Sequence, residues 1–344
     1  MKWLSLKSYN TKIFLIVSVF LVLTLLVVPF SACKGTPREV VNLTLVSGWS
    51  SGVAFNEKLM KYIEMVNADG KGKVFIDFKG GPEVAPITEA VGLVKKGVYD
   101  MAFSSPGYYG GLSPSSVPLY YLPADPVLLR QLGVHDLVDK IMRDEMQIAF
   151  LGWVSRGEPF VIVSKKPITS ANFSGILMHT LPMYTAALTS LGASTKTLQV
   201  PEFYQALQTN VVDAIPCPAG TVVKDYKLYE QAKYLLYPLI PITTSGEVLI
   251  NAAKFDSLPA DVQKILKDNM AEVEKEVYPF FSQKAQEVLA ELVAAKGMQK
   301  SELPKAEADK FIYAFTTYAW DQFKAKNPKW VPQLYDLVKS YIGK

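Results

Sequence analysis

The chain has 344 residues, of which 49% are apolar and 20% are charged, with 22 prolines and 21 glycines. This composition suits a packed globular protein of about two domains and excludes a disordered, collagen-like or coiled-coil chain. Basic residues exceed acidic ones by 36 to 32, but three of the lysines lie within the first twelve residues, before any acidic residue. The formal charge from residue 33 onward is therefore +1. That surplus is too small for a nucleic-acid-binding surface, so we expect no nucleic-acid partner.

The N-terminus has the order of a secretory signal over residues 1–32. Three lysines precede an apolar stretch at 13–30, and small residues follow it. The Ser-Ala pair before Cys33 resembles a bacterial lipobox, in which the cysteine is lipidated and becomes the new N-terminus, although Phe30 stands where the pattern usually has Leu. An uncleaved anchor is the alternative, because the stretch is just long enough to span a bilayer. Both interpretations place the rest of the chain in the periplasm, with 33–40 as a tether.

The chain has two cysteines. If Cys33 carries lipid, Cys217 has no partner, and no disulfide within the chain can stabilise the exported domain. We expect burial of apolar side chains to provide the stability instead, which is feasible at this length.

In chain order, the first half of the mature chain alternates between strands and helices. The pattern predicts strands at 40–47, 73–78 and 98–104, with helices at 54–66 and 86–96 between them. This order is typical of a parallel α/β sheet. The stretch 104–121 is rich in Ser, Pro, Gly and Tyr and follows the carboxyl end of a strand, where open α/β sheets bind ligands.

The second half repeats this order and then becomes helical. A helix is expected at 124–146, followed by strands at 148–154 and 160–164. A second α/β unit begins near residue 160. Its further strands are expected at 175–180 and 211–215, and its helices at 182–191 and 201–209. A helical pattern then covers 260–296 and would reach about 50 Å, more than one lobe needs. Pro279 is expected to kink it. Aromatic-rich helices follow at 305–342.

The residues give no pattern for catalysis, a metal or a cofactor. The mature chain offers His135, His179 and Cys217, without a CxxC or HExxH motif, which is too few ligands for a zinc site. The motifs GxGxxG and GxxxxGK[ST] do not occur. A Ser-His-Asp site that uses His179 stays open, because such triads form in space and not in sequence. We expect a binding protein, with no cofactor, and not an enzyme.

Four segments in the same order carry a resemblance to a known family. They are Gly-Gly-Pro-Glu at 80–83, the run at 89–102, the run at 201–213 and Leu-Pro-Ala-Asp-Val-Gln at 258–263. Together they resemble the extracytoplasmic solute-binding subunit of TRAP (tripartite ATP-independent periplasmic) transporters, over about residues 42–300.

This resemblance implies two α/β lobes joined by strands, a long helix that crosses both, and a ligand enclosed between the lobes by hinge motion. It also implies delivery of the ligand to integral membrane permease subunits. We expect lobe I to comprise 41–158 with about 248–280, and lobe II to comprise 159–247 with about 281–344.

The sequence departs from the family where the family binds its substrate. Most members have an Ile-Arg strand end whose arginine holds a substrate carboxylate as a bidentate pair, and His179 takes that place here. A second basic position falls on Pro159. Where members often read Gly-Gln-Glu-Asn-Pro, this chain has Ala-Ile-Pro-Cys-Pro at 214–218.

These departures predict a cleft for a small apolar or uncharged ligand, with one oriented hydrogen bond from His179. An arginine buried without an anion is costly, so a site for an uncharged ligand is expected to lack it. The candidate ligand-binding residues are Trp49, Ser105, Tyr108, Tyr109, Pro159, Phe160, Met178, His179, Ile215 and Cys217. The alternative is a scaffold lipoprotein without a transport function that uses the same fold to dock a partner lipoprotein through an apolar patch.

Overall fold

The computed structural model describes residues 39–342. The expected signal sequence, the lipidation site Cys33 and most of the tether lie outside these residues. Within the described range, no helix is both long and apolar enough to cross a membrane.

One mixed β-sheet organises the described chain. Its main path runs in the order β2-β1-β3-β9-β4-β7-β5-β6, and β8 joins β10 to β4. Strands β1, β2 and β3 are parallel to one another, as are β5, β6 and β7, whereas β4 and β9 run antiparallel to their neighbours. The strands are β1 (Val41–Ser47), β2 (Val74–Gly80), β3 (Met101–Ser104), β4 (Ile148–Ser164), β5 (Leu177–His179), β6 (Ser194–Lys196), β7 (Ala214–Pro218), β8 (Tyr234–Tyr237), β9 (Ile240–Asn251) and β10 (Gln299–Glu302).

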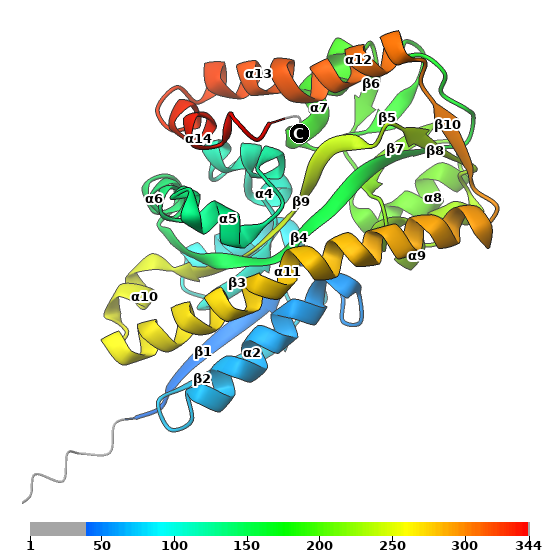
Figure 1. The fold of residues 1–344 in the computed structure, drawn as a ribbon. Coiled ribbons are helices and arrows are strands. Elements are labelled where there is room, and N and C mark those ends of the chain that lie inside the picture. The colour runs from blue at the N-terminus through cyan, green and yellow to red at the C-terminus, as the bar shows by residue number, and fades with distance from the viewer. Residues whose placement is uncertain (1–38, 343–344) are drawn as a thin grey trace, which may run out of the picture. The chain divides into compact units, whose positions relative to one another are not determined.

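Strands β4 and β9 run side by side through the middle of the molecule (Figure 1). The two strands expected at 148–154 and 160–164 are one continuous strand, β4. Charged residues and a proline lie between the two predicted strands. In the structure they are buried or half-buried, and β4 stays paired with β9 through register shifts between Arg156 and Pro159. Gly157, with φ of +108°, supplies the conformation that this irregular step requires.

The helices of the first half cover both faces of the sheet. The region expected as a loop at 104–121 forms two short helical segments. The helix expected at 124–146 is two helices, because Gly133 adopts a left-handed φ of +75° between them. The segments are η1 (Ala54–Asn56), α2 (Glu57–Asp69), α3 (Ile87–Lys95), α4 (Pro106–Tyr109), η2 (Pro114–Tyr121), α5 (Pro126–Gln131) and α6 (Val134–Met146).

The helices of the second half include the predicted long helix, α11, which is 35 residues long and contains Pro279. The C-terminal helices pack on α7 and also on η2 and α6. The segments are α7 (Pro182–Ser190), η3 (Val200–Glu202), α8 (Phe203–Gln208), α9 (Thr221–Asp225), η4 (Leu228–Glu230), α10 (Ala252–Ser257), α11 (Ala260–Ala294), α12 (Lys305–Tyr313), η5 (Ala314–Tyr318), α13 (Ala319–Lys326) and α14 (Val331–Val338).

Two strands begin three residues later than predicted. The strand expected at 98–104 begins only at Met101, since the backbone N–H of the preceding Asp100 donates to Oγ1 of Thr44 at 3.0 Å and not to a neighbouring strand. The strand expected at 211–215 is shifted to 214–218. There Pro216 and Pro218 pair with β4 residues, even though prolines usually end a strand.

Helix α11 lies close against β4, as Figure 1 shows. A Cβ on Gly152 of β4 would come within 2.3 Å of Oε1 of Glu274, so only glycine allows this approach. Glu274 accepts a hydrogen bond of 2.9 Å from the backbone N–H of Trp153 and pairs with Arg130 of α5. These contacts fix α11 on the strand that both halves of the sheet share.

Two hydrophobic clusters lie on opposite faces of the sheet, because successive strand side chains alternate between faces. Ala102 belongs to one cluster, and its neighbours Met101 and Phe103 belong to the other. The cluster that contains Phe103 includes side chains of α2 and α11, and the cluster that contains Ala102 includes side chains of α3, α6 and α7.

Candidate functional site

A pocket lies where the carboxyl ends of the parallel strands meet, as expected for a ligand site in an α/β sheet. Trp49 follows β1, and Ser105 and Tyr108 follow β3. From the other half of the sheet, His179 ends β5 and Cys217 lies near the end of β7. The topology therefore brings together side chains that are up to about 170 positions apart in the sequence.

The floor of the pocket comes from the two strands that both halves share. Strand β4 contributes Ser155 and Phe160, and β9 contributes Thr244, Ser245 and Gly246. Gly246 is required by the packing, because a Cβ there would lie 2.8 Å from the ring of Phe103 and 2.9 Å from Cβ of Ser155.

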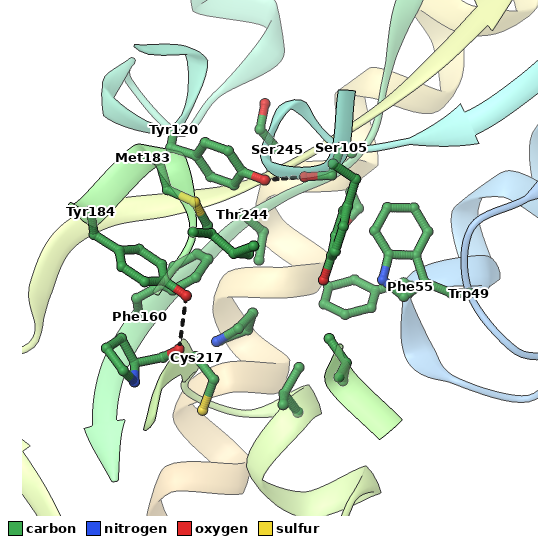
Figure 2. Close-up of a pocket in the computed structure, with 18 of the residues that line it drawn as sticks. Trp49, Phe55, Ser105, Tyr120, Phe160, Met183, Tyr184, Cys217, Thr244 and Ser245 are labelled. Carbon is green, nitrogen blue, oxygen red and sulfur yellow. Dashed lines mark hydrogen bonds between the residues drawn. The ribbon is translucent and has the colours of Figure 1, made fainter. Parts of the chain in front are cut away.

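The walls are mostly aromatic and aliphatic. Figure 2 shows Tyr120, Met183 and Tyr184 on one side of the pocket, facing Trp49 and Phe55 on the other. The space between the side chains is about 500 Å³ with its opening to solvent included, and only about 50 Å³ of it admits the centre of a water-sized molecule. The pocket is therefore narrow. The remaining lining residues are Leu181, Val200, Phe203, Pro216, Pro218 and Val222.

A second hollow of about 770 Å³, likewise with its opening to solvent included, shares Trp49, Tyr108 and Val200 with the pocket. Pro82 of the Gly-Gly-Pro-Glu segment and Pro201 both line it. Two of the segments that carry the family resemblance thus meet at this hollow.

The lining carries no formal charge: among the described residues that border the pocket there is no Asp, Glu, Lys or Arg. Several of its polar groups also bond to one another. Oγ of Ser105 and the hydroxyl of Tyr120 form a hydrogen bond, and the hydroxyl of Tyr184 donates to the carbonyl oxygen of Pro216 at 3.3 Å (Figure 2). These groups are satisfied without a ligand.

His179 is fully buried and uncharged. Burial lowers the pKa of its imidazole from 6.5 to about 3, against a smaller opposing effect of the Lys196 carbonyl. The backbone N–H of Leu198 donates to Nδ1 at 3.3 Å, which leaves the proton of the neutral ring on Nε2. Nε2 has no hydrogen-bond partner among residues 39–342. Oγ of Ser155, in the floor of the pocket, also has no hydrogen-bond partner among these residues.

A buried charged cluster lies behind the floor. The guanidinium of Arg156 donates to Oγ of Ser245 at 2.8 Å, and Glu247 accepts from Ser245 and, at 3.1 Å, from the hydroxyl of Tyr109. Burial lowers the pKa of Arg156 to about 9 and raises that of Glu247 to about 7. Arg156 does not line the pocket, so its charge is used within the protein.

Six of the ten residues expected at the site line this pocket. They are Trp49, Ser105, Tyr108, Phe160, His179 and Cys217. Burial raises the pKa of the Cys217 thiol, which opposes formation of a reactive thiolate.

The structure places the other four expected residues elsewhere. Tyr109 turns its hydroxyl to Glu247, and Met178 points to the opposite face of β5 from His179, into the core. Ile215 lies deeper in β7 than Cys217 and packs in the other core cluster. Pro159 pairs with Thr243 in the ladder between β4 and β9.

Sequence reasoning missed several lining residues. The run Thr-Thr-Ser-Gly at 243–246 interrupts an otherwise apolar stretch, and this polarity was a usable signal for Thr244 and Ser245. Met183 and Tyr184 lie shortly after His179, and they directly follow Pro182 at the start of α7. Phe55 and Tyr120 carry no such local signal, since the fold alone brings them to the pocket.

The described residues contain no group of three or more His, Cys, Asp or Glu side chains placed to hold a metal ion. The pocket is uncharged, lies at the carboxyl ends of parallel strands and has a floor made by the two antiparallel strands β4 and β9, which together are typical of a ligand-binding protein of the α/β class. The chain belongs to the bacterial extracellular solute-binding protein family 7 (DctP), whose model matches residues 46–326. The resemblance to TRAP solute-binding proteins is thereby confirmed.

Known proteins of this kind are similar over most of their length. The 2,3-diketo-L-gulonate-binding periplasmic protein YiaO of Escherichia coli K12 is 27% identical over 300 residues, which cover 83% of this chain and 84% of that protein. A TRAP periplasmic solute-binding protein from Pseudoalteromonas atlantica, solved with sodium and pyruvate, matches with a TM-score of 0.78 at 20% identity, over 88% of this chain and 94% of that one.

The Bordetella pertussis receptor DctP7, which binds pyroglutamic acid, matches with a TM-score of 0.75 at 20% identity, over 87% of this chain and 99% of that one. These likenesses confirm the expected two-lobed fold with a long helix.

Proposed function

We propose that this protein is the extracytoplasmic receptor of a TRAP-type transporter and that it binds a small, uncharged and largely apolar molecule, which it delivers to the membrane permease. The observation that carries the proposal is the uncharged lining of the pocket, which includes neutral His179. The family resemblance implies that most members have an arginine at this position.

The named ligands of the similar proteins make this departure informative. The ligands 2,3-diketo-L-gulonate, pyruvate and pyroglutamic acid all carry a carboxyl group. A carboxylate in the present pocket would lose its hydration without gaining a cationic partner, at a cost of several kcal/mol. Arg156 does not supply that partner, because its donors bind the carbonyl oxygens of Leu119, Leu122 and Pro123 as well as Ser245.

Enclosure of the ligand requires that the two halves of the sheet move relative to each other. We propose that the lobes divide at residues 158/159 of β4 and 247/248 of β9, as the family resemblance implies. Gly157 and the register shifts between Arg156 and Pro159 support a bend at this point of β4. Bending there would open and close the space above the floor.

The proposal is tested by identifying what co-purifies with the full chain. The protein is extracted from its native membrane, washed with detergent, denatured, and analysed by mass spectrometry for released small molecules. We expect an uncharged compound at close to one per chain. A carboxylate at that stoichiometry would contradict the proposal, as would an empty protein whose melting temperature no uncharged compound changes.

We also propose that residues 1–32 are removed and that Cys33 carries the lipid that tethers the receptor in the periplasm. Growth with an alkyne-labelled fatty acid would label the wild-type chain and a Cys217→Ser control but not Cys33→Ser. Equal labelling of all three proteins would refute lipidation at Cys33.

A further inference from the structure

We infer, on the basis of the proposed function, that the ligand is an uncharged carbonyl compound with a second polar group. Its carbonyl oxygen accepts a hydrogen bond from Nε2 of His179, and the second group bonds to Oγ of Ser155. The rest of the ligand contacts the aromatic walls.

Two side chains of the pocket each have a buried polar atom that no described residue bonds. His179 is 0% exposed and Ser155 is 2% exposed, yet Nε2 of the one and Oγ of the other have no partner in the part of the chain that the structure describes. A buried polar group without a partner costs about 1–3 kcal/mol. Both side chains line the pocket, so a bound ligand can remove this cost.

The other buried hydroxyl groups of the pocket are already bonded. Ser105 and Tyr120 bond to each other, Ser245 accepts from Arg156 and donates to Glu247, and Oγ1 of Thr244 accepts from the backbone N–H of Glu158 at 3.3 Å. A ligand group placed against them would have to compete with these bonds. The half-buried Tyr108 also lines the pocket, and its hydroxyl forms no hydrogen bond with the described residues. His179 and Ser155 are therefore the fully buried positions at which the pocket selects a polar group.

The bond from His179 to a ligand has a fixed direction. Because Leu198 fixes the proton of His179 on Nε2, this nitrogen is a donor and requires an acceptor on the ligand. A carbonyl oxygen is a strong uncharged acceptor, whereas a carboxylate would bring a charge into a lining that has no cation. The Ser155 hydroxyl both donates and accepts. An amide or lactam satisfies both residues, with its C=O toward His179 and its N–H toward Ser155.

The experiment uses matched probes on the full-length protein. The probes are 2-pyrrolidinone, cyclopentanone and methylenecyclopentane, together with their six-membered counterparts, and the dissociation constants are measured by ligand-observed NMR titration. The lactam offers both polar groups, the ketone only the carbonyl, and the hydrocarbon neither. We expect the affinity to fall in that order, with the lactam on the order of tenfold tighter than the hydrocarbon.

The variants separate the two contacts. His179→Leu should weaken the lactam and the ketone on the order of tenfold and leave the hydrocarbon unchanged, and His179→Gln should restore part of the loss through its amide N–H. Ser155→Ala should weaken the lactam several-fold and spare the ketone.

The chain offers a close control for each position. Ser104 is also fully buried with an unpartnered Oγ among the described residues, but it does not line the pocket, so Ser104→Ala should leave every dissociation constant unchanged. His135→Gln serves the same purpose for a half-buried histidine outside the pocket. Circular dichroism and the melting temperature establish that each variant folds.

Two results would overturn the inference while leaving the proposed function in place. One is equal affinity of the wild type for the hydrocarbon and the carbonyl probes. The other is a His179→Leu protein that folds and binds the carbonyl probes as tightly as the wild type. If the wild type binds none of these uncharged probes and its co-purified ligand is a carboxylate, the inference and the proposed function fail together.

Discussion

Nη1 of Arg156 lies 2.8 Å from Oγ of Ser245, and of these two residues only Ser245 lines the pocket. The guanidinium also donates to the carbonyl oxygens of Leu119 and Leu122, at 2.8 and 3.0 Å. The guanidinium thus does not face the pocket, and it links the floor to η2 and to the residues that follow η2. A buried arginine beside a binding pocket is in this case a structural residue.

Replacing Arg156 should destabilise the protein strongly. Arg156→Leu removes the cation near buried Glu247 and leaves three backbone carbonyls without their donor, which we expect to lower the free energy of unfolding by roughly 3–5 kcal/mol. Urea unfolding at pH 7 measures the effect. Arg143→Leu is the control, because Arg143 is about 30% exposed and pairs with Asp139 and Asp256 at the surface, so its loss should cost about 1 kcal/mol or less. Equal losses would contradict the structural role.

Introducing the family's arginine should change ligand preference. His179→Arg places a guanidinium in the pocket, where it can pair with a carboxylate in bidentate fashion. We expect affinity for pyruvate to rise on the order of tenfold or more relative to wild type, and affinity for its uncharged counterpart pyruvamide not to rise. Isothermal titration calorimetry of both compounds measures this. If the two proteins bind both compounds alike, residue 179 does not face the ligand in solution.

Glu158 should make stability depend on pH. Burial raises the pKa of its carboxyl from 4.5 to about 7, against hydrogen bonds from the backbone of Thr221 and Gly220 that lower it. Between these values the folded state binds more protons than the unfolded state, so the free energy of unfolding falls as pH rises from 4.5 to 7. The contribution of this group reaches at most about 1.4 kcal/mol per pH unit.

Glu158→Gln should therefore flatten this dependence by the contribution of one group, while Glu247 and Glu274, whose pKa values burial also raises to about 7, continue to act in the same direction. Urea unfolding at several pH values from 5 to 7 compares the slopes. Identical slopes for wild type and variant would show that Glu158 is ionised across this range.

Replacement by alanine should change the stability of the protein in opposite directions at two glycines. At Gly246 the added Cβ would meet the ring of Phe103 at 2.8 Å and Cβ of Ser155 at 2.9 Å, so we expect a loss of about 1–3 kcal/mol and weaker ligand binding. At Gly92, within α3, the Cβ would meet nothing within 4 Å. Gly92→Ala should stabilise the protein by about 0.5–1 kcal/mol. Thermal unfolding distinguishes the two, and a stabilised Gly246→Ala protein would contradict the packing described here.

The sequence by itself determined the α/β class, the long helix and the family. These follow from local information: hydrophobic periodicity marks helices and strands, and the four segments carry the resemblance within short stretches. It also pointed to His179 as a residue of the pocket and showed that 214–218 carries no charged residue. Both follow from the residue type at each position of a strand.

Only the tertiary structure decided how the pocket is built. Pairing with β9 makes one strand of 148–164, although the sequence predicts no strand at 155–159. The fold also separates Met178 from His179, because adjacent strand residues face opposite sides, and brings Phe55 and Tyr120 to the pocket from distant segments. Which buried polar atoms lack a partner depends on contacts between residues far apart in sequence. The ligand chemistry we infer from His179 and Ser155 therefore depends on the three-dimensional structure.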